Sequence, residues 1–167
     1  TSISDSSFSY GGSDTAIRLY RKLLLSSSIE PDDRVHIAVL KACTNSEDLF
    51  HGALLHHTLI ETMAESERYI VNTLVDMYGK CASLEEAEDI FDQLEEKNIV
   101  SWTALLSAYA HNGDIRKSHH SYKQMHQEGI LGDNVTYVSI LDACSCGEDL
   151  LEGKLIHACI AGTHLES

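Results

Sequence analysis

The sequence predicts an all-α solenoid in which helix–turn–helix units stack on one another, and three observations carry this prediction. The chain repeats itself, because residues 32–66 align without a gap to residues 133–167 and 13 of the 35 pairs are identical. Apolar residues recur with helical spacing, and turn residues separate the helical runs. No run shows the sustained alternation of apolar and polar residues that indicates a half-buried strand. Self-similarity over this length is typical of modular arrays, most of which are solenoids.

The first unit, residues 1–32, is degenerate or truncated. Its second helix is clear in the run from Ala16 to Leu23, whereas its first helix, across Ser2 to Phe8, is weak because the segment is rich in serine. The next unit covers residues 33–67. Pro31, the only proline in the chain, falls between these two units.

The unit of residues 68–98 predicts two helices joined by a turn. The first helix, over residues 69–78, has one apolar face formed by Ile70, Leu74, Met77 and Tyr78. The second helix has an apolar stripe formed by Leu84, Ala87, Ile90, Phe91 and Leu94. The run Ser83-Leu84-Glu85-Glu86 has the S-x-x-E form of a capping box, which fixes the start of the second helix.

The unit of residues 99–133 follows the same plan. Its first helix has one apolar face, formed by Trp102, Leu105, Leu106 and Tyr109. Asn112-Gly113 breaks that helix, a second helix runs from Ile115 to Met125, and Gly129 ends it. The last unit, residues 134–167, stops one residue short of its 35-residue counterpart, so we expect the chain to be a fragment of a longer protein.

The composition limits the possible partners. Twelve basic and 26 acidic residues give a net charge of −14, which opposes tight non-specific binding to nucleic acid. No stretch approaches the ~20 apolar residues of a membrane span, so no membrane association is expected. The five cysteines lack the spacing of a secreted scaffold, which favours a reducing compartment and small apolar positions between helices.

The units resemble the motifs of the pentatricopeptide repeat family, in the plant form (the PLS subclass) where long, short and standard motifs alternate. The long motif is similar to VHIAVLKACTNSEDLFHGALLHH and VTYVSILDACSCGEDLLEGKLIHA, the short motif to YIVNTLVDMYGKCASLEEAEDIFDQLEEKN, and the standard motif to NIVSWTALLSAYAHNGDIRKSHHSYKQMHQEGI. The 35-31-35 cycle of unit lengths separates the chain from tetratricopeptide arrays, which keep a constant period of about 34 residues.

This resemblance implies a right-handed superhelix that binds single-stranded RNA in a plant mitochondrion or chloroplast. Its role is then that of a specificity module for RNA processing or C-to-U editing, with other editing-complex proteins as further partners. The resemblance also implies that each motif faces one base, read by the fifth residue of its first helix and the last residue of the motif. Two polar side chains on rigid helices can match the donors and acceptors on one base edge.

By the same resemblance, the two middle units hold the clearest base readers. Asn72 with Asn98 is expected to read a pyrimidine, cytosine before uracil. Thr103 with Asp133 is expected to read guanine, because a carboxylate suits the N–H donors on the guanine edge and a threonine can donate and accept.

The other units contribute less. Asp32 ends the first unit with Thr1 or Ser2 opposite it, and favours guanine. The long motifs offer no polar reader at the fifth position, since one presents Ile37 with Glu67 and the other presents Val138 without a partner. From the N-terminus to the 5′ end, the expected target is 5′-G-N-C/U-G-N-3′.

Lys80 is the candidate phosphate ligand. It lies near the end of a predicted first helix, where a cation would neutralise the RNA backbone. His111 occupies the corresponding position in the next unit and is the weaker candidate. The two long motifs have Asn45 and Cys146 at this position.

Each expected reader has a structural alternative. Asp32, Asp133 and Asn134 lie where helices start and could act as N-caps, and for Asp133 the two roles carry equal weight. Asn72 and Thr103 could be solvated residues on helix surfaces.

No catalytic residue, cofactor, metal site or small-molecule substrate is predicted, and we do not expect an enzyme. The H-x-E and P-C-x-x-C motifs of the zinc deaminases do not occur in the sequence. Cys144-Ser145-Cys146 is isolated, and on a helix its two thiols point to different faces. The histidines of the predicted second helices are interpreted as partly exposed helix residues, and they are His56, His57, His119, His120 and His157.

A protein-interaction scaffold of the tetratricopeptide type, without RNA binding, is the alternative function. The net charge of −14 favours it, whereas the 35-31-35 cycle and the two polar pairs favour RNA. A third possibility is a fragment with too few good motifs to bind RNA alone. A neutral or basic concave face would keep the RNA hypothesis.

Overall fold

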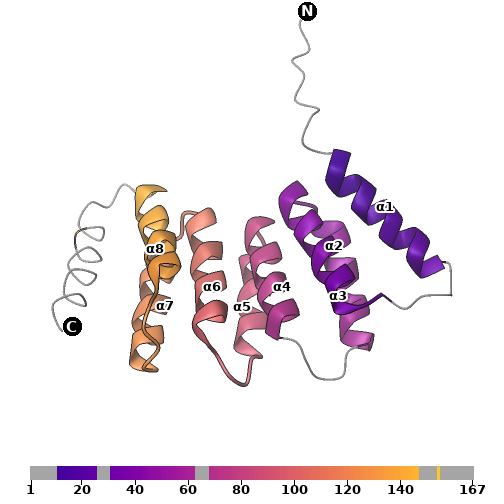
Figure 1. The fold of residues 1–167 in the computed structure, drawn as a ribbon. Coiled ribbons are helices and arrows are strands. Elements are labelled where there is room, and N and C mark those ends of the chain that lie inside the picture. The colour runs from indigo at the N-terminus through magenta and orange to yellow at the C-terminus, as the bar shows by residue number, and fades with distance from the viewer. Residues whose placement is uncertain (1–10, 26–30, 63–67, 147–153, 155–167) are drawn as a thin grey trace, which may run out of the picture.

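The computed structural model describes residues 11–25, 31–62, 68–146 and 154, and these residues form eight helices and no strands (Figure 1). The predicted all-α fold is therefore confirmed. None of the described helices is long and apolar enough to cross a lipid bilayer. The helices are α1 (Gly11–Leu25), α2 (Asp33–Ser46), α3 (Leu49–Thr62), α4 (Arg68–Lys80), α5 (Leu84–Asp92), α6 (Ile99–His111), α7 (Ile115–Gln127) and α8 (Asn134–Cys146).

The helices form two layers that run along the array. In the first layer, α2, α4, α6 and α8 pack side by side, each against the next. In the second layer, α3, α5 and α7 each pack against the first-layer helix before them and the one after them. Figure 1 shows the resulting row of helix pairs, with α1 packed against α2 at the N-terminal end. The predicted helix–turn–helix solenoid is thus confirmed.

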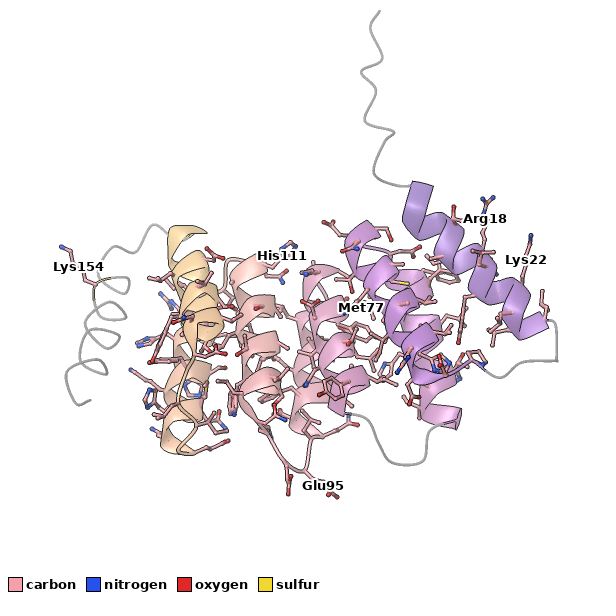
Figure 2. The ribbon with its side chains drawn as sticks, in the orientation of Figure 1. Arg18, Lys22, Met77, Glu95, His111 and Lys154 are labelled. Atoms are coloured by element: carbon pink, nitrogen blue, oxygen red, sulfur yellow. The ribbon has the colours of Figure 1, made fainter. Side chains whose placement is uncertain are left out.

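The core lies between the two layers and consists of the predicted apolar faces. Met77 on α4 is fully buried and lies inside the row of helices (Figure 2). Trp102 on α6 packs edge-on against Phe91 on α5, with their ring centroids 4.7 Å apart. Within the predicted stripes, these side chains are buried: Ile70, Leu74, Met77, Tyr78, Ala87, Ile90, Phe91, Trp102, Leu105, Leu106 and Tyr109.

The predicted helix ends are largely confirmed. The first helix of the third full unit ends at His111, before Gly113, whose φ of +69° is a left-handed conformation that favours glycine. Helix α7 ends at Gln127, two residues before Gly129, which has a φ of +78°. A side chain at either glycine would strain the turn.

The capping-box prediction at Ser83 is wrong in its hydrogen bonds. Helix α5 begins at Leu84 as predicted, but the Ser83 side chain makes no capping bond. At a similar backbone conformation, the Asp114 carboxylate accepts from Lys117 N at 3.0 Å. A true capping box instead joins Asn98 and Ser101 at the start of α6.

Helices α4 and α6 approach each other closely where Gly79 meets Ala108. A Cβ atom at Gly79 would lie 2.8 Å from the Cα of Ala108, which is closer than such atoms come in proteins. Asn112, just beyond α6, donates from Nδ2 to the carbonyl oxygen of Gly79 at 2.7 Å. Glycine and asparagine therefore fix the C-terminal ends of these two first-layer helices against each other.

Candidate nucleic-acid interface

A groove of about 390 Å³ lies on the first layer and spans four helices. Its lining comes from α2, α4, α6 and the first turn of α8. Three of the five predicted base readers, Asn72, Thr103 and Asp133, line this one groove. Asn98 and Asp32 do not line it. The structure thus brings together residues up to 61 positions apart in sequence, all from predicted reading positions.

Thr103 and Asp133 are linked through a third residue, Thr136. The Thr103 and Thr136 hydroxyl oxygens lie 3.0 Å apart, across the contact between α6 and α8. Asp133 accepts at Oδ1 from the Thr136 backbone N–H and from the Thr136 hydroxyl, each at 2.9 Å. Both bonds hold the pKa of the Asp133 carboxyl below its usual range. The bond from the Thr136 backbone N–H has the larger effect, and the bond from the Thr136 hydroxyl has the smaller one.

Asp133 therefore caps α8, but capping does not use the whole carboxylate. Both hydrogen bonds from Thr136 end on Oδ1, and the side chain is exposed. A carboxylate has two acceptor oxygens, so Oδ2 stays available to a ligand in the groove. Capping and base reading are compatible at this residue. Asn134, the other residue considered as a cap, is instead the first residue of α8.

Asn98 is the N-cap of α6 and uses one end of its amide for that purpose. Its Oδ1 accepts from the backbone N–H groups of Val100 at 2.9 Å and Ser101 at 3.1 Å. Its Nδ2 group, which donates, takes no part in these bonds. Its predicted partner Asn72 is half-buried on α4, and the enclosed Oδ1 of Asn72 has no hydrogen-bond partner among the described residues.

The remaining predicted positions lie outside the groove. Asp32 is exposed and caps α2, accepting from Val35 N at 3.0 Å. Thr1, Ser2 and Glu67, the expected partners in the two N-terminal units, fall outside the described residues. Ile37 packs against the core, whereas Val138 is 56% exposed.

Lys80 is paired within its own helix. Its ammonium group lies 3.4 Å from the Asp76 carboxylate one turn earlier. Such exposed pairs contribute about 0.2–0.5 kcal/mol, so a phosphate could displace Asp76 at little cost. His111 is exposed near the end of α6, as Figure 2 shows.

Lys41 was missed by the sequence reasoning. It is exposed on α2 and lines the groove together with Asn72. A usable signal existed, because Lys41 has no acidic residue three or four positions away on its helix, whereas Lys80 has Asp76. An unpaired cation on a first helix is better placed to meet phosphate than a paired one.

A second missed feature is a set of exposed apolar side chains along the groove. The second residue of three successive first-layer helices is apolar and exposed: Tyr69 by 73%, Val100 by 53% and Val135 by 60%. All three line the groove. These three residues do not belong to the apolar faces that form the core. An apolar residue off the buried face of its helix is the sequence signal that could have identified them.

Few charged side chains stand at the groove. Of the lining residues, Lys41 is basic and Asp76 and Asp133 are acidic, while Lys80 pairs with Asp76 without lining the groove. Many of the acidic residues behind the negative net charge lie elsewhere, on α5 and the loop that follows it. Glu95 projects outward from this loop (Figure 2). Among the described residues this segment carries Glu85, Glu86, Glu88, Asp89, Asp92, Glu95 and Glu96. The lining of the groove carries one lysine against two carboxylates, so a neutral or basic face stays a prediction of the RNA hypothesis.

The histidines of the second layer are partly or fully exposed, as predicted: His56 and His119 are half-buried, and His57 and His120 are exposed. His56 on α3 is half-buried, with Nδ1 3.0 Å from the Tyr78 hydroxyl on α4. Burial, and then the neighbouring His57, lower the pKa of His56. His157 falls outside the described residues.

Comparisons with known proteins identify the repeat. A model of the PPR repeat family matches residues 97–146, and a model of the PPR repeat matches residues 69–99. A pentatricopeptide repeat-containing protein of Arabidopsis thaliana is 33% identical over 147 residues, which is 88% of this chain. A mitochondrial one from the same plant is 34% identical over 79% of the chain, and the chloroplastic protein DOT4 is 35% identical over 78%. The chain spans only 25%, 29% and 15% of these three relatives.

Solved structures of the same kind share the fold. The maize pentatricopeptide repeat protein PPR10 superposes with a TM-score of 0.75 at 19% identity, over 92% of this chain and 22% of that one. PPR10 in complex with an 18-nt psaJ RNA element superposes with a TM-score of 0.73 at 19% identity, over 83% of this chain and 21% of that one. The chain belongs to the pentatricopeptide repeat family.

Proposed function

We propose that this chain is a sequence-specific binder of single-stranded RNA that assigns one base to each repeat. One observation carries the proposal: Asn72, Thr103 and Asp133 line a single groove, with exposed apolar side chains at a constant place beside them. The fold shared with PPR10, which has been crystallised with RNA, supports it.

The groove offers both kinds of contact that a base needs. A base is a flat apolar ring with a polar edge, and single-stranded recognition combines stacking on the faces with hydrogen bonds to the edge. A base seated between Val100 and Val135 would place its faces against apolar side chains. Its edge would then meet Thr103 and Asp133, which lie between these valines in sequence and line the same groove.

The neighbouring unit has the same design with different chemistry. Tyr69 and Val100 supply the apolar surfaces, while Asn72 and Asn98 supply amides. The unused Nδ2 of Asn98 donates, which suits the O2 and N3 acceptors of cytosine. Because a buried acceptor without a partner costs about 1–3 kcal/mol, reorientation of the Asn72 amide towards a base would recover part of that cost. We propose that this pair selects a pyrimidine.

Phosphate contacts come from lysines in this proposal. Lys41 and Lys80 neutralise the backbone, and Asp32 reads a guanine at the N-terminal unit. The resulting target is 5′-G-N-C/U-G-N-3′. Such contacts position the strand, whereas the polar pairs select the sequence.

The biological role is proposed from the relatives and the unit lengths. The 35-31-35 cycle of unit lengths supports membership of the PLS subclass, and the mitochondrial and chloroplastic relatives support a location in an organelle. We propose a specificity module for RNA processing or C-to-U editing, with the chemistry supplied by another domain or protein. The chain itself is proposed to be non-catalytic.

The alternative is a protein-interaction scaffold. Exposed apolar residues on α3, with Phe50 at 71% and Ile60 at 65%, favour it, as does the acidic surface of α5. This alternative predicts binding that ignores the groove residues.

The test compares four short RNAs that differ only at the base opposite Thr103. At low ionic strength the unaltered chain should prefer guanine. Thr103→Asn should shift the preference towards uracil, because Asp133 accepts from the uracil N3–H while the new amide donates to a uracil oxygen. Thr73→Ala is the matched control, since Thr73 lines the groove but its hydroxyl donates to the Tyr69 carbonyl at 2.7 Å.

The outcomes separate the two functions. A uracil shift in Thr103→Asn with no shift in the control supports base reading. Unchanged preference in Thr103→Asn contradicts the residue assignments. Failure of the unaltered chain to bind any of the RNAs favours the scaffold.

A further inference from the structure

We infer that Thr136, which belongs to the following repeat, makes the Thr103–Asp133 pair selective for guanine by fixing the direction of its hydroxyl protons. The inference rests on the proposed function and assigns a positioning residue to it. Thr136 is the third residue of α8 and is fully buried. It does not line the groove, so it would act on a base only through Thr103 and Asp133.

The hydrogen bonds around the Thr136 hydroxyl allow one arrangement. A hydroxyl has one proton to donate and two lone pairs that accept. Three groups surround Thr136 Oγ1: Asp133 Oδ1 at 2.9 Å, the Asp133 backbone N at 3.3 Å and Thr103 Oγ1 at 3.0 Å. An ionised carboxylate only accepts, and a backbone N–H only donates. Thr136 therefore donates to Asp133 Oδ1 and accepts from the Asp133 N–H.

This assignment fixes the proton of Thr103. The single proton of Thr136 is already committed to the carboxylate, which is the stronger, charge-assisted acceptor. The remaining lone pair of Thr136 can only receive a proton, so Thr103 must be the donor in the bond between the two hydroxyls. The protons run in one direction, from Thr103 to Thr136 to Asp133.

The groove consequently meets only acceptors from this pair. Because Thr103 donates its hydroxyl proton to Thr136, it offers only lone pairs to a ligand in the groove. Asp133 offers the acceptor Oδ2. Guanine is the base whose Watson–Crick edge carries two adjacent donors, N1–H and the N2 amino group. Adenine places the N1 acceptor beside its amino donor, so one of its contacts would set a lone pair against a lone pair. A free threonine hydroxyl would tolerate adenine by rotating, and Thr136 removes that freedom.

In the neighbouring unit, the residue that corresponds to Thr136 makes different hydrogen bonds. Ser101 is the third residue of α6, and it donates to the Asn98 backbone oxygen at 2.8 Å while accepting from the Asn98 N–H at 2.9 Å. The hydroxyl proton of Ser101 goes to the backbone, so this hydroxyl bonds no side-chain oxygen of a reader; only the Ser101 backbone N–H bonds Asn98 Oδ1. The ordering of reader protons is therefore specific to the Thr103–Asp133 pair among the described repeats.

The contact between α6 and α8 contains a natural control. The Ser107 and Ser139 hydroxyl oxygens lie 2.9 Å apart, and Ser139 also bonds the Val135 carbonyl at 3.0 Å. This second hydroxyl pair crosses the same two helices but has no link to Asp133. Removing it tests whether loss of any buried hydroxyl here disturbs recognition.

The experiment measures the affinities of the chain for two RNAs that carry guanine or adenine opposite Thr103. Thr136→Val keeps the side-chain shape and removes the hydroxyl. The guanine-to-adenine affinity ratio should fall by about fivefold, the value of one net hydrogen bond. Thr136→Ser should retain the ratio, and Ser139→Ala should leave it unchanged. If the valine variant does not fold, Thr136→Ala provides the same comparison.

A second readout needs no RNA. Thr136→Val should raise the pKa of the Asp133 carboxyl, measured by NMR titration, because one of the two hydrogen bonds from Thr136 is lost. Thr136→Ser should not raise it.

Each result decides the inference. An unchanged affinity ratio in Thr136→Val, or equal binding of guanine and adenine by the unaltered chain, overturns it while RNA binding stands. Absence of binding to either RNA overturns the proposed function as well. A ratio that falls equally in Ser139→Ala shows a general packing effect and also overturns the inference.

Discussion

Asp133→Asn should change the preferred base opposite Thr103 from guanine to adenine. The asparagine oxygen can keep the place of Oδ1, where it accepts the two 2.9 Å bonds from Thr136. The amide nitrogen then replaces Oδ2 and turns an acceptor in the groove into a donor. Thr103 still accepts, so the pair matches the amino donor and N1 acceptor of adenine.

The magnitude follows from the bonds exchanged. A well-formed pair of contacts to a base edge is worth about 1–3 kcal/mol of discrimination, or roughly 5- to 150-fold. The groove is open on one side, so we expect the lower end, a change of about tenfold in the guanine-to-adenine ratio. The fold should lose about 1 kcal/mol, because a neutral cap replaces a charged one at a helix N-terminus.

Fluorescence anisotropy with the guanine and adenine RNAs at fixed low salt measures the ratio, and urea unfolding measures the stability. Removing a negative charge strengthens binding to any RNA, so the control must remove one elsewhere. Glu95→Gln does so on the exposed loop between α5 and α6, at a residue that does not line the groove. The control should raise both affinities equally. A guanine preference that survives Asp133→Asn refutes the assignment of this residue.

Three further outcomes follow from the packing and the charges. Lys41→Gln should weaken binding to all RNAs alike and reduce the slope of log affinity against log salt by about 0.7, measured by salt titration, and a loss confined to one sequence would contradict a phosphate role. Gly79→Ala should lower the free energy of unfolding, measured in urea, by about 1–2 kcal/mol, because overlap of the new Cβ with Ala108 outweighs the better helix propensity of alanine. A variant of equal or greater stability would contradict the close approach of α4 and α6. The pKa of His56 is lowered in the fold, so the contribution of the neutral imidazole to the free energy of unfolding is full above pH 6.5 and is lost as the pH falls below that value. His56→Gln should therefore flatten the dependence of the unfolding free energy on pH below 6.5, measured by urea unfolding at several pH values.

The architecture could be predicted because its determinants are local. The spacing of Trp102, Leu105 and Tyr109 sets a helical face, and Gly113 and Gly129 stop the helices in positive φ. These signals act within a few residues and do not depend on the neighbouring repeats. The faces that the helices bury could therefore be derived before any contact between them was known.

The site was only partly predictable, because its parts come from different repeats. The reading positions Thr103 and Asp133 followed from the resemblance, but Thr136 did not, since its role depends on a contact between α6 and α8. Lys41 and Val100 were missed for a related reason. Their place in the groove depends on how neighbouring first-layer helices pack, which no single helix reveals.

The bond between Thr103 and Thr136 has a consequence for how such arrays are cut and recombined. The two hydroxyls belong to consecutive units, so under the proposed base assignment the groups that face one base come from both sides of a unit boundary. If a unit were transplanted with its own two readers but before a different successor, it would lose the partner that orders its proton. The transferable element for recognition is then the junction, meaning one first helix together with the opening turn of the next. Chimeras that replace the whole unit after Asp133 remove Thr136, so their selectivity for the base opposite Thr103 should change. Chimeras joined after the first turn of α8 keep Thr136, so their selectivity for that base should not change.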